Sequence, residues 1–229
     1  MNKVCCIIPS RINSSRFPGK PLAKINGREL VLRVCDIAKR CQYIDEIIVA
    51  TEDKIIYDLA ISNSYKSIIT NTFVTCTHRV SSVTKHLNYD YFINIQGDEP
   101  CLEPSLIDEM IKFSLEKKKK MVQAVYPLQK FDIEDEDCVK VVVNNGNIIY
   151  LTRNPEVITE NLFGISGVYV YDKETIDNFL GNDLRLVESW QGLDTFGFIG
   201  KVPVTPFYFP NRTYAVDRPS DISKVEKII

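Results

Sequence analysis

The first half of the chain alternates between two hydrophobic patterns. Short, continuous apolar runs are typical of strands that are buried on both faces, and they predict strands at residues 4–9, 46–51, 67–70 and 91–95. Between them, apolar residues recur at helical spacing and predict helices at residues 29–41, 54–63, 78–87 and 104–117. Alternating strands and helices indicate a wound α/β fold with a mainly parallel sheet.

The second half of the chain is richer in strand patterns. Strands are predicted at residues 121–128, 167–171 and 202–209, a hairpin at 139–151 around Asn145-Gly146, and helices at 172–180, 185–193 and 220–229. No repeat or low-complexity linker divides the chain. We therefore expect one domain, residues 1–229, in which a smaller β-rich lobe within about residues 121–210 is inserted and covers the site.

The loop after the first predicted strand, SRINSSRFPGK, carries three cations. Arg11 and Arg16 offer planar guanidinium groups that suit phosphate oxygens, and Lys20 offers a compact charge. Neither a Walker loop nor a GxGxxG motif is present. Phosphate binding and simple solvation of a surface loop both explain this composition.

A second polar loop, QGDEP at residues 96–100, follows the strand predicted at 91–95. Asp98 is a candidate Mg²⁺ ligand, because Mg²⁺ is often held by one or two carboxylates together with substrate phosphates. Asp98 could instead cap the helix that begins near Pro104, and Glu99 is the weaker candidate because proline follows it. Asp217 is a candidate second ligand, although capping of the last helix is its simpler role. Ligands of wound sheets bind at the carboxyl ends of strands, so both loops should share one edge.

Composition narrows the possible functions. The net charge of −2 and pI of about 5.8 argue against bulk nucleic-acid binding. Seven cysteines, an odd number without a CxxC pair, indicate neither a disulfide framework nor a zinc site and favour a reducing cytoplasm. No apolar run approaches the roughly 20 residues of a membrane span. His78 and His86 are expected on one helix, in surface or partner-binding roles rather than as a general base.

Three motifs, in order, resemble one enzyme family. RxxSSRFPGKPL, NIQGDEP and VDRPSDI are similar to motifs of the 3-deoxy-manno-octulosonate (Kdo) cytidylyltransferases, and EIIVAT and VKVVV…LTR extend the resemblance along the chain. The resemblance implies a Rossmann-like nucleotidyltransferase core with a smaller dimerisation lobe, and a cytoplasmic homodimer. It also implies a Mg²⁺-dependent transfer of CMP from CTP to the anomeric hydroxyl of a 2-keto-3-deoxy sugar acid, releasing pyrophosphate, in lipopolysaccharide biosynthesis.

The resemblance also implies roles for single residues. Arg11, Arg16 and Lys20 would hold the triphosphate of CTP, and Lys20, Arg16 and Asp98 would be catalytic. Asp98 and Asp217 would hold Mg²⁺, Gln96 would touch the sugar acid, and Thr77 and Arg79 would lie near the cytidine.

The chain departs from the family pattern at the positions expected near the acceptor sugar and near the cytosine base of the nucleotide. Cys76 and His78 replace a glycine and an acid, residues 162–166 lack the basic residue and histidine that meet the sugar acid, and Gln191, Gly192 and Asp194 replace an acid, a glutamine and an arginine. Our hypothesis is that the acceptor differs from ordinary Kdo. A relative using another nucleotide and a catalytically silent nucleotide-binding homologue remain alternatives.

Overall fold

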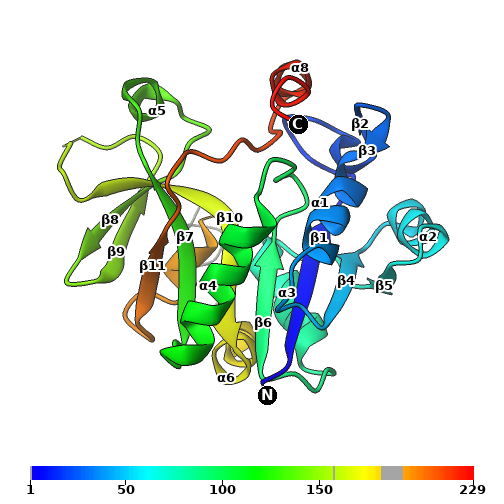
Figure 1. The fold of residues 1–229 in the computed structure, drawn as a ribbon, viewed down its shortest axis with the longest axis horizontal. Coiled ribbons are helices and arrows are strands. Elements are labelled where there is room, and N and C mark those ends of the chain that lie inside the picture. Colours follow the sequence, from blue (N-terminus) through cyan, green and yellow to red (C-terminus); the bar gives the residue numbers. More distant parts are fainter. Residues whose placement is uncertain (1, 157, 182–192) are drawn as a thin grey trace.

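The computed structural model describes residues 2–156, 158–181 and 193–229, and a nine-stranded sheet forms its centre (Figure 1). Seven strands form the main path: β1 Val4–Ser10, β4 Glu46–Thr51, β5 Lys66–Ile69, β6 Tyr91–Ile95, β7 Met121–Pro127, β10 Leu162–Asp172 and β11 Val204–Tyr208. Their spatial order is β11-β7-β10-β6-β1-β4-β5, and β6, β1, β4 and β5 are parallel. The predicted wound α/β core is confirmed.

The other side of the sheet is mixed. Strand β10 runs antiparallel to both β6 and β7, whereas β11 is parallel to β7. Strands β8 Lys140–Asn144 and β9 Asn147–Thr152 form the predicted hairpin, in which Asn145 and Gly146 have positive φ, and β8 pairs with the start of β10. Residues 121–210 therefore supply strands to the central sheet, and their predicted role in dimerisation stays a prediction.

Most helices lie close to their predicted positions. The helices are α1 Leu30–Lys39, α2 Lys54–Ser62, α3 Cys76–Thr84, α4 Pro104–Glu116, α5 Lys130–Glu134, α6 Lys173–Asp177 and α8 Ile222–Val225. The exceptions are α5, which was not predicted, and the final helix, which is shorter than predicted. The final helix was predicted over 220–229 but is only four residues long; turns follow it, and Asn26 donates to the Glu226 side chain and to the Ile229 carbonyl. The helix predicted over 185–193 lies almost wholly outside the described residues.

Two apolar cores sandwich the sheet. On β1, Cys6 and Ile8 face the core formed with α1, α2 and α4, whereas Cys5 and Ile7 face the core formed with α3 and α6. Figure 1 shows α4 crossing the front of the sheet. Strands buried on both faces explain the continuous apolar runs of the sequence. Each fully buried aliphatic side chain stabilises the fold by about 1.5–3 kcal/mol.

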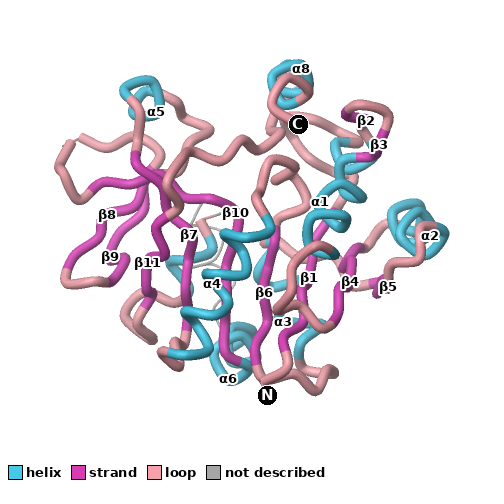
Figure 2. Tube along the Cα trace, in the orientation of Figure 1, coloured by secondary structure: helices cyan, strands magenta, loops and turns pink. Residues whose placement is uncertain are grey.

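Loops gather along the edge at which β1 and β6 end (Figure 2). The loop after β1 leads through a small ribbon, β2 Lys24–Ile25 and β3 Arg28–Glu29, into α1. The segment between β11 and α8 crosses the same edge and brings residues near the C-terminus to this ribbon (Figure 1). The first loop, the QGDEP loop and the last segment of the chain thus meet at one place, which the sequence predicted for the two loops.

Candidate active site

A cavity of about 1000 Å³ opens at this edge. It is lined from both halves of the chain, and its lining includes the predicted residues Arg11, Arg16, Lys20, Arg79, Gln96, Asp98 and Asp217. Thr77 is not among its described lining residues. Residues that are far apart in sequence therefore line one open cavity, which is the geometry of a small-molecule site.

A backbone contact brings the two predicted Mg²⁺ ligands together. The Val216 N–H donates to the Asp98 carbonyl oxygen at 2.8 Å, which places Asp217 beside Asp98. Val216 is fully buried in a small apolar cluster with Ile25, Leu30 and Val225. This cluster stabilises the association of the last segment with the first loop.

Neither aspartate caps a helix, which contradicts the simpler roles that the sequence allowed. The position before α4 is occupied by Glu103, and the Asp221 carboxylate accepts from the N–H groups of Asp217 and Arg218. The carboxylates of Asp98 and Asp217 are therefore left to face the cavity cations.

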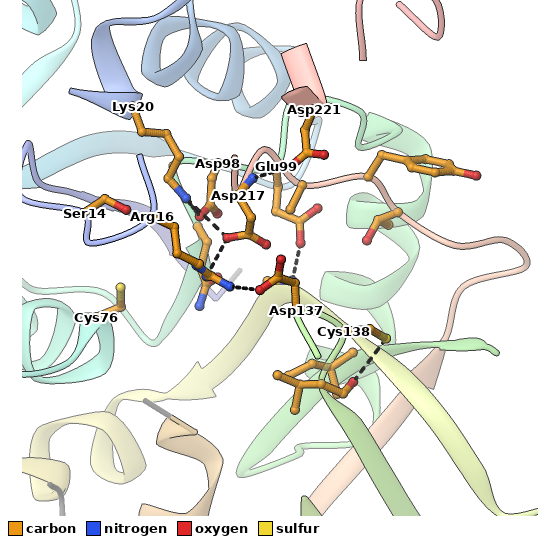
Figure 3. Close-up of a pocket in the computed structure, with 18 of the residues that line it drawn as sticks. Ser14, Arg16, Lys20, Cys76, Asp98, Glu99, Asp137, Cys138, Asp217 and Asp221 are labelled. Carbon is orange, nitrogen blue, oxygen red and sulfur yellow. Dashed lines mark hydrogen bonds and ion pairs between the residues drawn. The ribbon is translucent and has the colours of Figure 1, made fainter. Parts of the chain in front are cut away.

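Cations and carboxylates alternate along the cavity (Figure 3). Their order is Arg218, Asp137, Arg16, Asp217, Lys20 and Asp98. The Lys20 Nζ lies 2.6 Å from Asp98 Oδ2 and 3.6 Å from Asp217 Oδ1. The Arg16 guanidinium lies 2.7 Å from Asp217 Oδ1 and also pairs with Asp137, which Arg218 contacts at 2.7 Å. Arg16 and Lys20, two of the three cations predicted to hold phosphates, are thus paired with carboxylates, and so is Arg218, which was not predicted.

The pKa values of these alternating charged groups depend on burial and on neighbouring charges. Burial alone would lower the pKa of Lys20, but Asp98 and Asp217 outweigh it and raise the value, so the ammonium keeps its charge. Burial and the nearby Asp98 charge raise the pKa of Asp217. A further cation would stabilise the ionised forms of these two partly buried carboxylates, which share one ammonium group.

The Asp98 and Asp217 pair fits a divalent cation of the Mg²⁺ type. Asp98 Oδ1 is buried and has no hydrogen-bond partner among the described residues, so this oxygen remains available as a ligand. The same residues contain no group of three or more His, Cys, Asp or Glu side chains that could hold a metal by themselves. Two carboxylates completed by substrate phosphates are the usual arrangement for Mg²⁺.

A bulge in β10 shapes the floor of the cavity. The pairing of β10 with β7 shifts between Ile165 and Tyr169. Within this bulge, Gly167 forms two hydrogen bonds with the QGDEP loop. Its N–H donates to Glu99 Oε1 at 2.5 Å, and its carbonyl accepts from the Gln96 N–H at 2.8 Å. A side chain at Gly167 would lie 2.8 Å from Gln96 Oε1. Glycine therefore allows the QGDEP loop to pack closely on β10.

Glu99 is buried beneath the cavity. Its side chain also accepts from the Ser166 hydroxyl at 3.2 Å, and Oε2 has no partner among the described residues. Burial raises the pKa of Glu99 to about 7. The sequence ranked Glu99 below Asp98 as a metal ligand, and its contacts with Gly167 and Ser166 indicate a role in positioning the loop.

We expect Glu99 to make the fold less stable as the pH rises. Its ordinary pKa is 4.5 and its folded pKa is about 7, so between these values the folded state binds more protons than the unfolded state. The contribution of Glu99 to stability is then fully present below pH 4.5 and falls by up to about 3 kcal/mol as the pH rises through 7.

Urea unfolding between pH 5 and 8, in EDTA, would measure this effect. Glu99→Gln keeps an oxygen that accepts from Gly167 and should flatten the decline. Parallel curves for the variant and the original protein would contradict the prediction.

The cavity wall at the start of α3 holds the residues predicted near the cytidine. The Arg79 guanidinium is buried and pairs with Glu52 at 2.9 Å, while Thr77 is 1% exposed and its N–H donates to Asp194 Oδ2 at 2.8 Å. Cys76 lines the cavity, and the exposed Arg11 donates weakly to the Phe73 carbonyl at 3.5 Å. Arg11 and Cys76 are thus placed to meet a ligand, whereas Arg79 and Thr77 support the wall.

The histidine prediction is half right. His86 is exposed but follows the end of α3, so the two histidines do not share a helix. His78 is buried: its ring lies 4.7 Å from that of Phe179, and its Nδ1 lies 2.9 Å from Thr75 Oγ1. The expectation of a surface role for His78 is wrong, because its side chain faces the core behind α3.

Among the residues that the sequence analysis did not single out, Asp137 and Arg218 belong to the alternating charges of the cavity. Asp137 lies in a loop without a motif, and no local signal identifies it. Arg218 is visible in VDRPSD, where the related motif has threonine, and this extra cation could have been singled out. Asp194 lines the cavity and is 9% exposed, whereas Gln191 and Gly192 lie outside the described residues.

The whole chain is similar to known nucleotidyltransferases. Residues 5–190 match the family described as cytidylyltransferase. Proteins named 3-deoxy-manno-octulosonate cytidylyltransferase from Nitratidesulfovibrio vulgaris strain Hildenborough and from Chlamydia pneumoniae are 32% and 31% identical to it. Both alignments cover 97% of this chain, and they cover 94% and 92% of the respective relatives.

Solved structures of nucleotidyltransferases are also similar to this chain. The structure of CMP:2-keto-3-deoxy-manno-octonic acid synthetase complexed with CTP superposes with a TM-score of 0.86 and 26% identity, covering 99% of this chain and 98% of the other. A putative glucose-1-phosphate thymidylyltransferase from Bacillus anthracis, at a TM-score of 0.79 and 12% identity, covers 98% of this chain and 94% of its own and shares the fold alone. Within the described residues, no helix has the length and apolar character needed to cross a membrane. The chain belongs to the cytidylyltransferase family and, within it, to the 3-deoxy-manno-octulosonate cytidylyltransferases.

Proposed function

We propose that this protein transfers CMP from CTP to the anomeric hydroxyl of Kdo and releases pyrophosphate. The observation that carries the proposal is the match to Kdo cytidylyltransferases over nearly the full length of both chains. The alternating cations and carboxylates of the cavity support it, because they suit an anionic nucleotide bound together with a divalent cation. The enzyme is accordingly a CTP-dependent nucleotidyltransferase.

In the proposed reaction, the hydroxyl attacks the α-phosphorus and pyrophosphate leaves. Lys20 and Arg16 would exchange their carboxylate partners for phosphate oxygens and stabilise the charge that grows on the leaving group. Arg11 would bind the same triphosphate from the α3 side of the cavity. Asp98 and Asp217 would hold Mg²⁺, which when bound neutralises phosphate charge and acts as a Lewis acid. No covalent nucleophile is needed.

The acceptor end of the cavity supports a second candidate, CMP transfer to a different acid. The stretch 162–166 forms the start of β10 and carries no cation, and Asp194 places a buried carboxylate in the cavity wall. Gln96 lines the cavity next to this strand and stays our candidate for contact with the sugar acid. Each missing charged hydrogen bond would weaken binding of a sugar acid by about 1.5–3 kcal/mol.

Pyrophosphate release in the presence of Mg²⁺ tests both candidates. Purified protein should release pyrophosphate with CTP and Kdo, and not with ATP, GTP or UTP. Release with CTP and only another sugar acid would favour the second candidate. No release with any pair, although CTP binds, would favour the silent nucleotide-binding homologue and refute both.

We also propose a homodimer that uses the strands beyond the cavity. Tyr150 on β9 and Tyr208 on β11 are 53% and 52% exposed, and aromatic side chains of this kind are enriched at protein interfaces. Sedimentation velocity at micromolar concentration would contradict this if it gave a single 26 kDa species. A cytoplasmic location and a place in lipopolysaccharide biosynthesis stay predictions that follow from the family.

A further inference from the structure

Asp137 holds two arginines that come from opposite ends of the chain. Its Oδ2 accepts from Arg218 Nε at 2.7 Å, its Oδ1 lies 3.4 Å from Arg218 Nη2, and Oδ1 also pairs with Arg16 Nη1. Asp137 lies on the loop between α5 and β8, Arg218 on the last segment and Arg16 on the first loop, and all three line the cavity. One carboxylate thus bridges two guanidinium groups.

Two oxygens of a phosphate group bridge guanidinium groups in the same way, because both anions offer charged acceptors to a planar donor fork. We propose that Asp137 stands where a phosphate group of the nucleotide binds, and that Arg218 is a further cation of the triphosphate site. This inference rests on the proposed function, since it concerns the same cavity and the same nucleotide.

Asp137 differs from Asp98 and Asp217, the other two carboxylates that alternate with cations along the cavity. Asp98 and Asp217 share Lys20 and would keep a cation near them if a divalent ion bound with the nucleotide. Asp137 pairs with arginines alone among the described residues, so a phosphate that binds Arg16 competes directly with it. Opposite effects are therefore expected at the two positions: Asp137 weakens nucleotide binding, and Arg218 strengthens it.

Exposure favours such an exchange. The Arg218 side chain is 57% exposed and that of Asp137 is 24% exposed, so neither is locked in the core. Ion pairs at this exposure contribute little to stability. An incoming triphosphate that carries several charges can therefore displace Asp137 at small cost to the fold.

Calorimetric titration with CTP, and separately with inorganic tripolyphosphate, tests the inference on the full chain in Mg²⁺. Asp137→Asn should tighten binding of both ligands by roughly two- to fivefold, because the competing charge is removed. Arg218→Gln should weaken both by about tenfold, the loss of one charge-assisted contact. Asp58→Asn on α2 and Arg40→Gln after α1 make the same charge changes at exposed positions outside the cavity and should leave both affinities unchanged.

Two results would overturn the inference: weaker binding by Asp137→Asn, which would mean that Asp137 positions Arg16 for the ligand, or unchanged binding by Arg218→Gln. Thermal unfolding of each variant shows whether it is folded. Tripolyphosphate has neither a base nor an acceptor, so its titration still tests Arg218 if no CTP turnover is found. Failure of the proposed function is thereby separated from failure of this inference.

Discussion

Replacing Asp98 with asparagine should lower kcat for CMP transfer by roughly 10²- to 10³-fold, a typical cost of removing one charged or preorganised group from a transition state. Asparagine keeps the shape and one oxygen of the side chain but loses the charge. Lys20 would then keep only the Asp217 carboxylate, at 3.6 Å, as its charged partner among the described residues. The buried oxygen Oδ1, which has no hydrogen-bond partner among the same residues, would lose its value as a Mg²⁺ ligand. Both the metal and the ammonium would be held less well.

Initial rates measured across a range of Mg²⁺ concentrations would check this prediction. The concentration of Mg²⁺ that gives half-maximal rate should rise in Asp98→Asn, and excess Mg²⁺ should recover part of the loss. Glu109→Gln, an exposed carboxylate on the neighbouring α4, is the matched control and should behave like the original protein. An unchanged Mg²⁺ dependence in Asp98→Asn would remove this residue from the metal site.

The core of the fold was predictable because its signal is local. Strands β1, β4 and β6 are continuous apolar runs that are buried on both faces, and the helices between them bury one apolar stripe each. The positions of the two polar loops followed from the rule that parallel strands of a wound sheet end at the same edge. Arg16, Lys20 and Asp98 were therefore expected near one another before any contact was known.

The rest depends on contacts that no local pattern encodes. Asp137 enters the site because the loop before β8 reaches across to the first loop, 121 residues away in sequence. The bulge in β10 depends on hydrogen bonds between Gly167 and two residues, Gln96 and Glu99, of the loop that follows β6. Helical periodicity indicates which face is apolar, but a histidine suits either face, so the buried side of α3 was not expected to hold His78.

Arg79 shows how a family motif can combine two roles. The resemblance places it near the cytidine, and the structure places it in the cavity wall, yet its side chain is only 3% exposed and pairs with Glu52, which is 14% exposed. It also donates to the Thr70 hydroxyl. A buried charge with this many partners is expected to stabilise the wall whether or not it touches a nucleotide.

Arg79→Met should therefore lower the free energy of unfolding by about 3 kcal/mol, because Glu52 would be left as an unpaired, largely buried carboxylate. Urea unfolding at neutral pH measures this. The double variant Arg79→Met, Glu52→Gln removes both charges and should regain most of the loss, since the penalty comes from the uncompensated charge and not from the absent pair. The single variant Glu52→Gln, which leaves the guanidinium buried, should be destabilised for the same reason. If instead Arg79→Met kept its stability and bound CTP more weakly, the guanidinium would act on the nucleotide, as the resemblance implied. The ion pair of Arg79 with Glu52 would then contribute little to the stability of the cavity wall.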